Sequence, residues 1–121
     1  MKKSHYWEDV YAVTRLIPSG RVSTYGAIAE YLRLGSPRMV GWALNHAHTF
    51  SQDPLGSGII PAQRVVNRNG ELTGRHHFPT PTLMEELLIL EGVEVVNSKV
   101  QNFDKVFWHP LADLEEDVDL D

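Results

Sequence analysis

The sequence contains no cysteine. This absence excludes disulfides, thiolate metal ligands and a cysteine nucleophile in the chain. No apolar run approaches the roughly 20 residues that a membrane-spanning helix needs. No apolar stretch follows Lys2 and Lys3, as it would in a secretory signal. We therefore expect one cytoplasmic domain, associated with the nucleoid if its source is bacterial, and 121 residues suffice for a buried core.

An excess of basic residues is also missing, since the formal net charge is −5. The acidic residues are unevenly spread, and six of the 16 stand in residues 113–121. In the rest of the chain the 11 Lys and Arg residues outnumber the ten remaining acids. A dense acidic block repels itself and is typical of a disordered tail. We expect a folded domain over residues 1–111 and a disordered acidic tail over 112–121, so the net charge does not exclude DNA binding.

The spacing of apolar residues predicts three helices in the first half of the chain, over residues 6–16, 23–32 and 36–45. The third begins with Ser36 as a capping residue and Pro37 at its first position. Two helices joined by a short turn are typical of a helix-turn-helix. On spacing alone, a helix pair that touches no DNA fits the pattern equally well.

The second half of the chain alternates short extended segments with one further helix. Residues 59–66 are apolar and β-branched at both ends, and a tight turn is expected at 69–70. A helix is predicted from about residue 80 to 91, followed by a short strand over 93–96. The aromatic residues of 103–108 are expected to pack back onto the domain. The pattern predicts a mainly α fold with a minor β component.

Four segments, in this order and at these separations, indicate kinship with a known family. They are Gly20-Arg21-Val22-Ser23-Thr24-Tyr25, Ser36-Pro37-Arg38-Met39-Val40-Gly41-Trp42-Ala43-Leu44, Ile60-Pro61-Ala62-Gln63-Arg64-Val65-Val66 and Leu90-Glu91-Gly92-Val93. Together they resemble the DNA-binding domain of the O6-alkylguanine-DNA alkyltransferases. The resemblance runs from about Tyr6 to Trp108 and implies a winged-helix-like fold with a helix-turn-helix.

The chain departs from this family at the reactive position. The family has proline-cysteine-histidine-arginine-valine where this chain has Pro61-Ala62-Gln63-Arg64-Val65. By resemblance, the family's histidine relays through water to a glutamate and keeps the sulfur deprotonated, and Glu91 stands at the glutamate's position. A methyl group at Ala62 has no electron pair to attack an alkyl carbon, and the Gln63 amide is not a base near neutral pH. The resemblance is therefore to the alkyltransferase-like branch, which binds alkylated guanine and passes it to nucleotide excision repair. We expect a monomeric protein that is not an enzyme and has no cofactor.

The resemblance implies roles for three residues of the helix-turn-helix. Tyr25 would press on the phosphate beside the target and help to rotate the nucleotide out of the duplex. Arg38 would fill the gap that the extruded base leaves. Gly41 would let the recognition helix approach the minor groove closely.

The resemblance also implies a pocket for the extruded base. Ala62 and Val66 would line this pocket, and Arg75 would stack over the base as a cation over an aromatic face. Arg64 and Glu91 would support the pocket, with Arg64 bonded to nearby backbone or to Glu91.

The remaining candidates have more ordinary expected roles. Three arginines would contact phosphates, which sets register without reading sequence: Arg21, Arg33 and Arg68. Trp42 is expected in the core, with a base-stacking platform as the alternative. No metal site is expected from the histidines, whose spacings and neighbours do not fit a ligand set: His46, His48, His76 and His77.

The leading hypothesis is non-catalytic recognition of O6-alkylguanine in duplex DNA by minor-groove binding and base flipping, which flags the damage for excision. Two alternatives stay open. A sequence-specific regulator would read the major groove, usually as a dimer. A protein-interaction scaffold would keep the pocket only as a relic, with the acidic tail as its working part.

Overall fold

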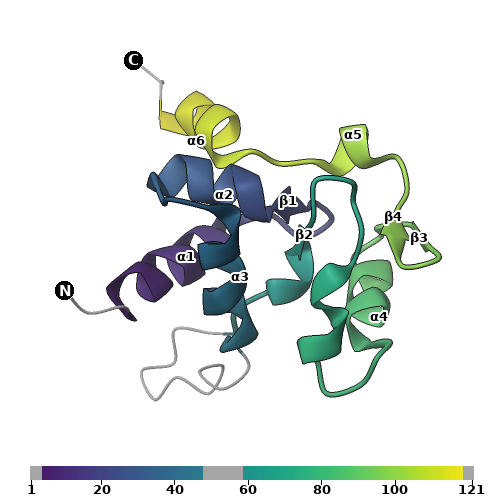
Figure 1. Ribbon diagram of the computed structural model, residues 1–121. Helices are drawn as coiled ribbons and strands as arrows, with labels where there is room; N and C mark the ends of the chain where they lie inside the picture. Colours follow the sequence, from purple (N-terminus) through teal and green to yellow (C-terminus); the bar gives the residue numbers. More distant parts are fainter. Residues whose placement is uncertain (1–3, 48–58, 119–121) are drawn as a thin grey trace.

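The computed structural model describes residues 4–47 and 59–118 (Figure 1). Within these residues the fold is mainly α with a minor β component, as predicted. The α-helices are α1 (Ser4–Leu16), α2 (Tyr25–Leu32), α3 (Pro37–Asn45), α4 (Leu83–Leu90), α5 (Phe103–Val106) and α6 (Pro110–Val118). The 3-10 turns are η1 (Ala62–Arg64) and η2 (Thr73–His77), and the strands are β1 (Ser23–Thr24), β2 (Val65–Val66), β3 (Val95–Val96) and β4 (Lys99–Val100).

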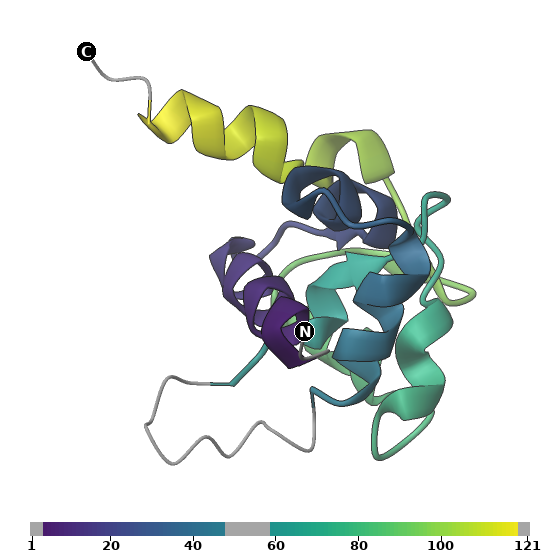
Figure 2. The ribbon, with the colours of Figure 1, turned by 60° about the vertical axis from the view of Figure 1, so that its left-hand side comes forward.

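Helices α1, α2 and α3 lie side by side and enclose the first of two core clusters (Figures 1 and 2). Val10, Ile28 and Val40, one from each helix, are fully buried there. The buried Tyr11 hydroxyl donates a 2.7 Å hydrogen bond to the carbonyl oxygen of Ala43. This bond ties α1 to α3 and so fixes the orientation of α3.

The α2–turn–α3 unit is the predicted helix-turn-helix, and its ends are set by local hydrogen bonds. The Thr24 hydroxyl accepts from the backbone N–H of Ala27 at the start of α2. The Ser36 hydroxyl accepts from the N–H of Arg38 at the start of α3. Arg33 ends α2 in the left-handed conformation, with φ of 58°. The chain therefore turns between the two helices within a few residues.

A short parallel strand pair joins the two halves of the domain. Ser23 pairs with Val65 and Thr24 with Val66, which places η1 near the segment that leads into β1. Successive residues of a strand point to opposite faces. Accordingly Val65 packs in the first core cluster, and Val66 packs in a second cluster with Leu72, under α4 and the β3–β4 hairpin.

The aromatic segment before α6 returns to β1, as the sequence predicts. The N–H of Val22 donates to the carbonyl oxygen of Val106, and the N–H of Trp108 donates to the carbonyl oxygen of Val22 at 2.7 Å. Trp108 is buried in the first core cluster. This segment therefore closes over the edge of the β1–β2 pair.

Helix α6 begins just before the predicted domain boundary at residue 111 and runs across it. Residues 112–118 are helical where an irregular tail was expected, and 119–121 lie outside the described residues. The N–H of Leu111 donates to Nδ1 of His109, and the N–H of His109 donates to the Asp113 carboxylate. Acidic side chains near a helix N-terminus interact favourably with its dipole. Figure 2 shows α6 packed beside α2 at its start and extending outward from there.

Candidate nucleic-acid interface

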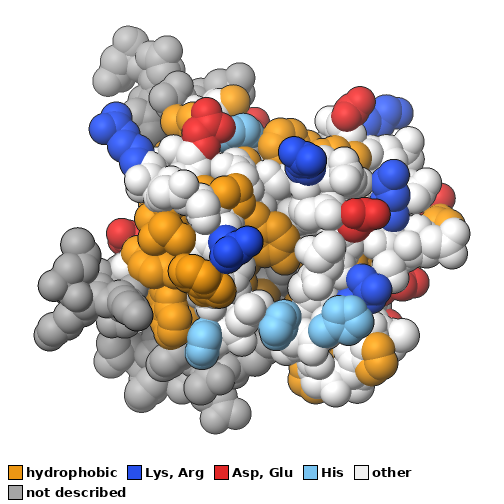
Figure 3. Space-filling model, in the orientation of Figure 1, with side chains coloured by type: hydrophobic (Ala, Val, Ile, Leu, Met, Phe, Trp, Pro, Cys, Tyr) orange, Lys and Arg blue, Asp and Glu red, His pale blue; other side chains and the backbone are white. Residues whose placement is uncertain are grey.

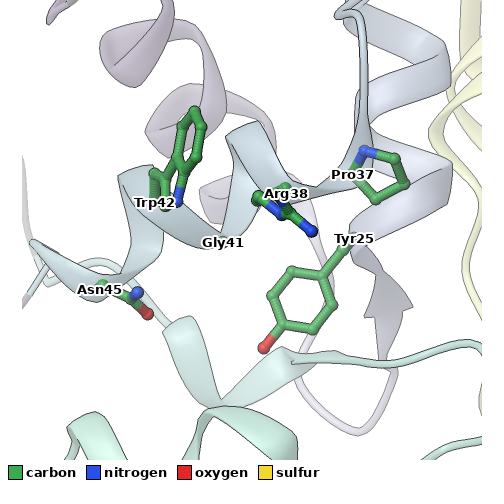
Figure 4. Close-up of a pocket in the computed structure, with 6 residues that line it drawn as sticks. All are labelled: Tyr25, Pro37, Arg38, Gly41, Trp42 and Asn45. Atoms are coloured by element: carbon green, nitrogen blue, oxygen red, sulfur yellow. The ribbon is translucent and has the colours of Figure 1, made fainter.

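The start of α2 and the outer face of α3 border a hollow of about 400 Å³ (Figure 4). Its lining brings together the three residues predicted for DNA binding, Tyr25, Arg38 and Gly41. Three further residues line it, which are Pro37, Trp42 and Asn45. Arg38, Trp42 and Asn45 project from successive turns of α3, so that one helix presents most of this surface.

Tyr25 is held between two glycines. A Cβ added at Gly41 would lie 4.0 Å from Cε1 of the ring, and a Cβ added at Gly74 would lie 2.9 Å from the hydroxyl oxygen. Burial raises the pKa of the Tyr25 hydroxyl above its ordinary value of 10.0, although a hydrogen bond with the Thr73 side chain opposes the shift. The hydroxyl is therefore neutral near pH 7, and its oxygen occupies space that a side chain at position 74 would take.

Arg38 is an exposed cation in the first turn of α3. A positive charge there is unfavourable, because the helix N-terminus already carries a partial positive charge. Among the described residues, no carboxylate lies within ion-pair distance of it. Its guanidinium is thus available for an external anion or base.

Trp42 is exposed, which corrects the expectation that it belongs to the core. Its exposed fraction is 51%, and its ring borders the hollow. The buried side of α3 consists of Val40, Ala43 and Leu44. Position 42 is about 200° around the helix from Val40, so it faces away from that side. Asn45, which sequence reasoning missed, follows Gly41 by one helical turn on the same surface.

The positions of the family's histidine and glutamate form a second hydrogen-bonded centre, between η1 and the end of α4. Nε2 of Gln63 donates to Glu91 at 2.9 Å. Arg64 donates to both oxygens of the same carboxylate, as predicted, and its Nη1 also donates to the carbonyl oxygen of Ile17. The backbone N–H of Gly20 donates to Glu91 at 3.3 Å. Glu91 therefore joins three segments that are distant in sequence.

The Glu91 carboxylate stays ionised because of these donors. Burial alone would raise its pKa, but hydrogen bonds from Arg64, Gln63 and the Gly20 N–H, together with the Arg64 charge, hold the pKa below its ordinary value. The carboxylate is thus committed to these three partners. Among the described residues, this centre therefore offers no free base.

Comparisons with known proteins identify the family of this chain. The family model described as "6-O-methylguanine DNA methyltransferase, DNA binding domain" matches residues 5–93. This chain belongs to the O6-alkylguanine-DNA alkyltransferase family. It is an alkyltransferase-like member and cannot be the acceptor-cysteine enzyme, because the chain has no cysteine.

Three comparisons with this alkyltransferase-like chain are informative. Alkyltransferase-like protein 1 of Schizosaccharomyces pombe is 30% identical over 115 residues, which cover 91% of this chain and all of that protein. A crystal structure of S. pombe Atl1 in complex with damaged DNA containing O6-carboxymethylguanine has a TM-score of 0.74, with the same coverage. The "DNA base-flipping protein" of Escherichia coli K12 is 34% identical over 113 residues, covering 89% of this chain and 78% of that protein.

The residues that the alkyltransferase resemblance assigns to a base pocket do not line the hollow of Figure 4. Val66 is fully buried in the second core cluster and does not border this hollow. Ala62 is buried at the edge of the first cluster, with 7% of its surface exposed. Arg75 is partly buried in η2, and its Nη1 donates to the carbonyl oxygen of Leu72. In this conformation Arg75 is bonded to its own turn.

The predicted phosphate contacts divide into two kinds. Arg21 is a structural residue, because its guanidinium donates to the carbonyl oxygens of Val106 and Phe107, at 3.1 and 2.6 Å. Arg33 and Arg68 are exposed. On the face shown in Figure 3, Lys and Arg side chains lie apart from one another, and some on the right-hand side lie beside acidic side chains. This distribution fits a few separate phosphate contacts better than a continuous basic groove.

Metal binding and membrane insertion find no support in the described residues. No group of three His, Cys, Asp or Glu within 4–47 and 59–118 is placed to hold a metal ion. Over the same residues, every helix is too short or too polar to cross a bilayer.

Proposed function

We propose that this protein recognises alkylated guanine in duplex DNA and does not repair it. One observation carries the proposal: Tyr25, Arg38 and Gly41 border a single hollow on α3, while the position of the family's nucleophile holds Ala62. The complex of the S. pombe relative with damaged DNA supports this function. The binding elements are thus kept in a chain that has lost the group to which the alkyl would transfer.

Helix α3 would enter the minor groove, with Arg38 as the leading side chain. Gly41 has no side chain to hold the helix away from the groove. Extrusion of a base costs a few kcal/mol of stacking and pairing, and a side chain that fills the gap offsets part of this cost. The exposed Arg38 is suited to that role. The name of the E. coli relative, a base-flipping protein, is consistent with it.

Tyr25 would act on the phosphate beside the extruded nucleotide. Its hydroxyl lies close to Gly74 and is neutral near pH 7. An uncharged ring can press against a phosphate without the repulsion that a phenolate would add. The rotated nucleotide would then move toward the Ala62 side of the domain. Arg75 would have to leave its bond to Leu72 in order to stack over the base.

The proposed function requires a second repair system, because the alkyl group stays on the base. We propose that this second system is nucleotide excision repair. We also expect one monomer to bind each lesion. In a reconstituted excision assay, addition of the protein should raise the incision of a duplex that carries one O6-methylguanine. An unchanged incision rate would remove this part of the proposal.

The central experiment compares affinities for two otherwise identical duplexes, one with O6-methylguanine and one with guanine, by fluorescence anisotropy. The wild-type protein should bind the modified duplex more tightly. Arg38→Ala should lower that preference by about tenfold, since it removes the residue that compensates for the lost base stack. The matched control is Arg68→Ala, which removes another exposed arginine and should weaken binding to both duplexes alike. Equal wild-type affinities would overturn the proposal.

A further inference from the structure

Trp42 is a large apolar side chain that is displayed on the proposed DNA-binding surface. It follows Arg38 by four residues on α3, so the two project from the same side of the helix one turn apart. Both border the hollow. The exposed fraction of Trp42 is 51%, whereas Trp108 is buried and Trp7 is half-buried. Trp42 is thus the tryptophan best placed to lose solvent contact when α3 meets a partner.

The residues around Trp42 are better suited to contact a DNA groove than the apolar surface of a partner protein. The cation of Arg38 and the hydrogen-bonding amide of Asn45 line the hollow with it, as does Gly41, which has no side chain. Apolar wedges next to Arg and Asn side chains are common in proteins that bind the minor groove. The four residues from Arg38 to Trp42 advance about 6 Å along the helix, which is nearly two base-pair steps. With Arg38 at the lesion, the indole would lie over one of the two base pairs next to the lesion.

We propose that Trp42 contacts the base pair that flanks the lesion and makes affinity depend on that pair, with A·T preferred over G·C. The inference rests on the proposed function and extends it to sequence context. The indole has one polar group, an Nε1–H that donates only. At A·T the floor of the minor groove offers acceptors alone, whereas G·C adds the guanine 2-amino donor. That amino group is a second donor, so it cannot accept a hydrogen bond from the indole N–H.

The test uses four duplexes, with O6-methylguanine or guanine at the centre and A·T or G·C pairs on both sides. The wild-type protein should prefer A·T flanks by about fivefold, the value of one net hydrogen bond. Trp42→Ala should abolish this preference and weaken binding by about tenfold, because the apolar contact is also lost. Trp42→Phe should keep most of the affinity and lose the preference, since it retains a ring without the N–H.

The control variant is Leu16→Ala. Leu16 is as exposed as Trp42, at 52%, but it ends α1 and does not line the hollow. It should leave all four affinities unchanged. Tryptophan emission provides a second readout, because DNA should alter it in the wild type and much less in Trp42→Phe.

The outcomes separate this inference from the proposed function. Equal affinity for modified and unmodified duplexes would refute lesion recognition. The ratio of affinities for A·T and G·C flanks, measured with either central base, would still test the role of Trp42. A wild-type protein that prefers the lesion without any flank preference would refute the inference alone. The inference also fails if Trp42→Ala binds all four duplexes as the wild type does.

Discussion

The side-chain amide of Gln63 donates a 2.9 Å hydrogen bond to the carboxylate of Glu91. An amide nitrogen in this position can hold the carboxylate but cannot relay a proton to a neighbour. Arg64 and the Gly20 N–H bind the same carboxylate. A group that supports catalysis elsewhere in the family is a structural link in this chain, and the first prediction concerns its energy.

Glu91→Gln should lower the free energy of unfolding by about 2 kcal/mol, because it removes the charge from a mostly buried ion pair and leaves Arg64 without a counterion. Urea unfolding at pH 7 would measure the change. Glu94→Gln is the control, because Glu94 is exposed and its substitution should change the free energy of unfolding little. Equal stabilities of the two variants would show that the ion pair contributes nothing.

The same carboxylate predicts a dependence of stability on acid. The folded state holds the pKa of Glu91 below its ordinary value of 4.5, so the ionised form stabilises the fold. This stabilisation is fully present above pH 4.5 and is lost as the pH falls through the lowered pKa. Unfolding measured between neutral pH and pH 3 should therefore show an acid-dependent component that is smaller in Glu91→Gln.

Ala62→Cys should accept little or no alkyl group from a duplex with O6-methylguanine. The new thiol would lack a base, because Gln63 carries no proton-accepting nitrogen. Mass spectrometry of the protein after incubation with the duplex would detect a transferred methyl group. Efficient transfer to this single variant would contradict our account of the missing relay.

The double variant Ala62→Cys, Gln63→His is the companion to that experiment. It restores a base next to Glu91 and should transfer more methyl than the single variant does. Ala62→Ser, Gln63→His is the negative control, since a hydroxyl is the weaker nucleophile. Equal transfer by the single and double cysteine variants would show that residue 63 does not matter.

Gly74→Ala should weaken DNA binding by displacing the Tyr25 hydroxyl, which a Cβ at position 74 would approach to 2.9 Å. Overpacking of this kind costs about 1–3 kcal/mol, so we expect affinity for the modified duplex to fall about fivefold or more. Gly35→Ala is the control, because its Cβ would meet nothing closer than the Met39 sulfur at 3.9 Å. A normal affinity in Gly74→Ala would mean that Tyr25 needs no fixed position.

Tyr11→Phe should lower the free energy of unfolding by about 1 kcal/mol, since it removes the hydrogen bond to Ala43. Burial, with a smaller effect of Tyr6, raises the pKa of Tyr11 to about 12. The folded state thus favours the neutral hydroxyl, and stability should fall as the pH rises from 10 toward 12. Thermal unfolding across this range should show a weaker pH dependence in the variant.

The helices and the family were predictable because they depend on local patterns. The capping residues Thr24 and Ser36 and the helical apolar spacing locate α2 and α3 to within two residues. The predicted bond between Arg64 and Glu91 is present, and the return of Trp108 to the core is confirmed. Each of these features is marked in the sequence itself, by a capping residue, a periodic apolar face, a pair of opposite charges or a large aromatic ring.

The errors concern residues whose environment is set by distant parts of the chain. Trp42 looked like core because of its size, but Val40, Ala43 and Leu44 already fill the buried side of α3. Arg21 looked like a phosphate ligand, yet two carbonyls some 85 residues away bind it. The pairing of β2 with β1 likewise directs Val66 into the second core cluster, which its neighbours in the sequence do not indicate. No local pattern contains these pairings.

The hydrogen bonds between Val22 and the segment before α6 limit where this domain can be truncated. The family match ends at residue 93, but Val22 exchanges backbone hydrogen bonds with Val106 and Trp108, and Arg21 bonds to the same stretch. A fragment cut at 93 would expose two unpaired peptide groups and a stranded guanidinium at the base of the helix-turn-helix. The smallest piece that folds as a unit therefore has to reach at least Trp108.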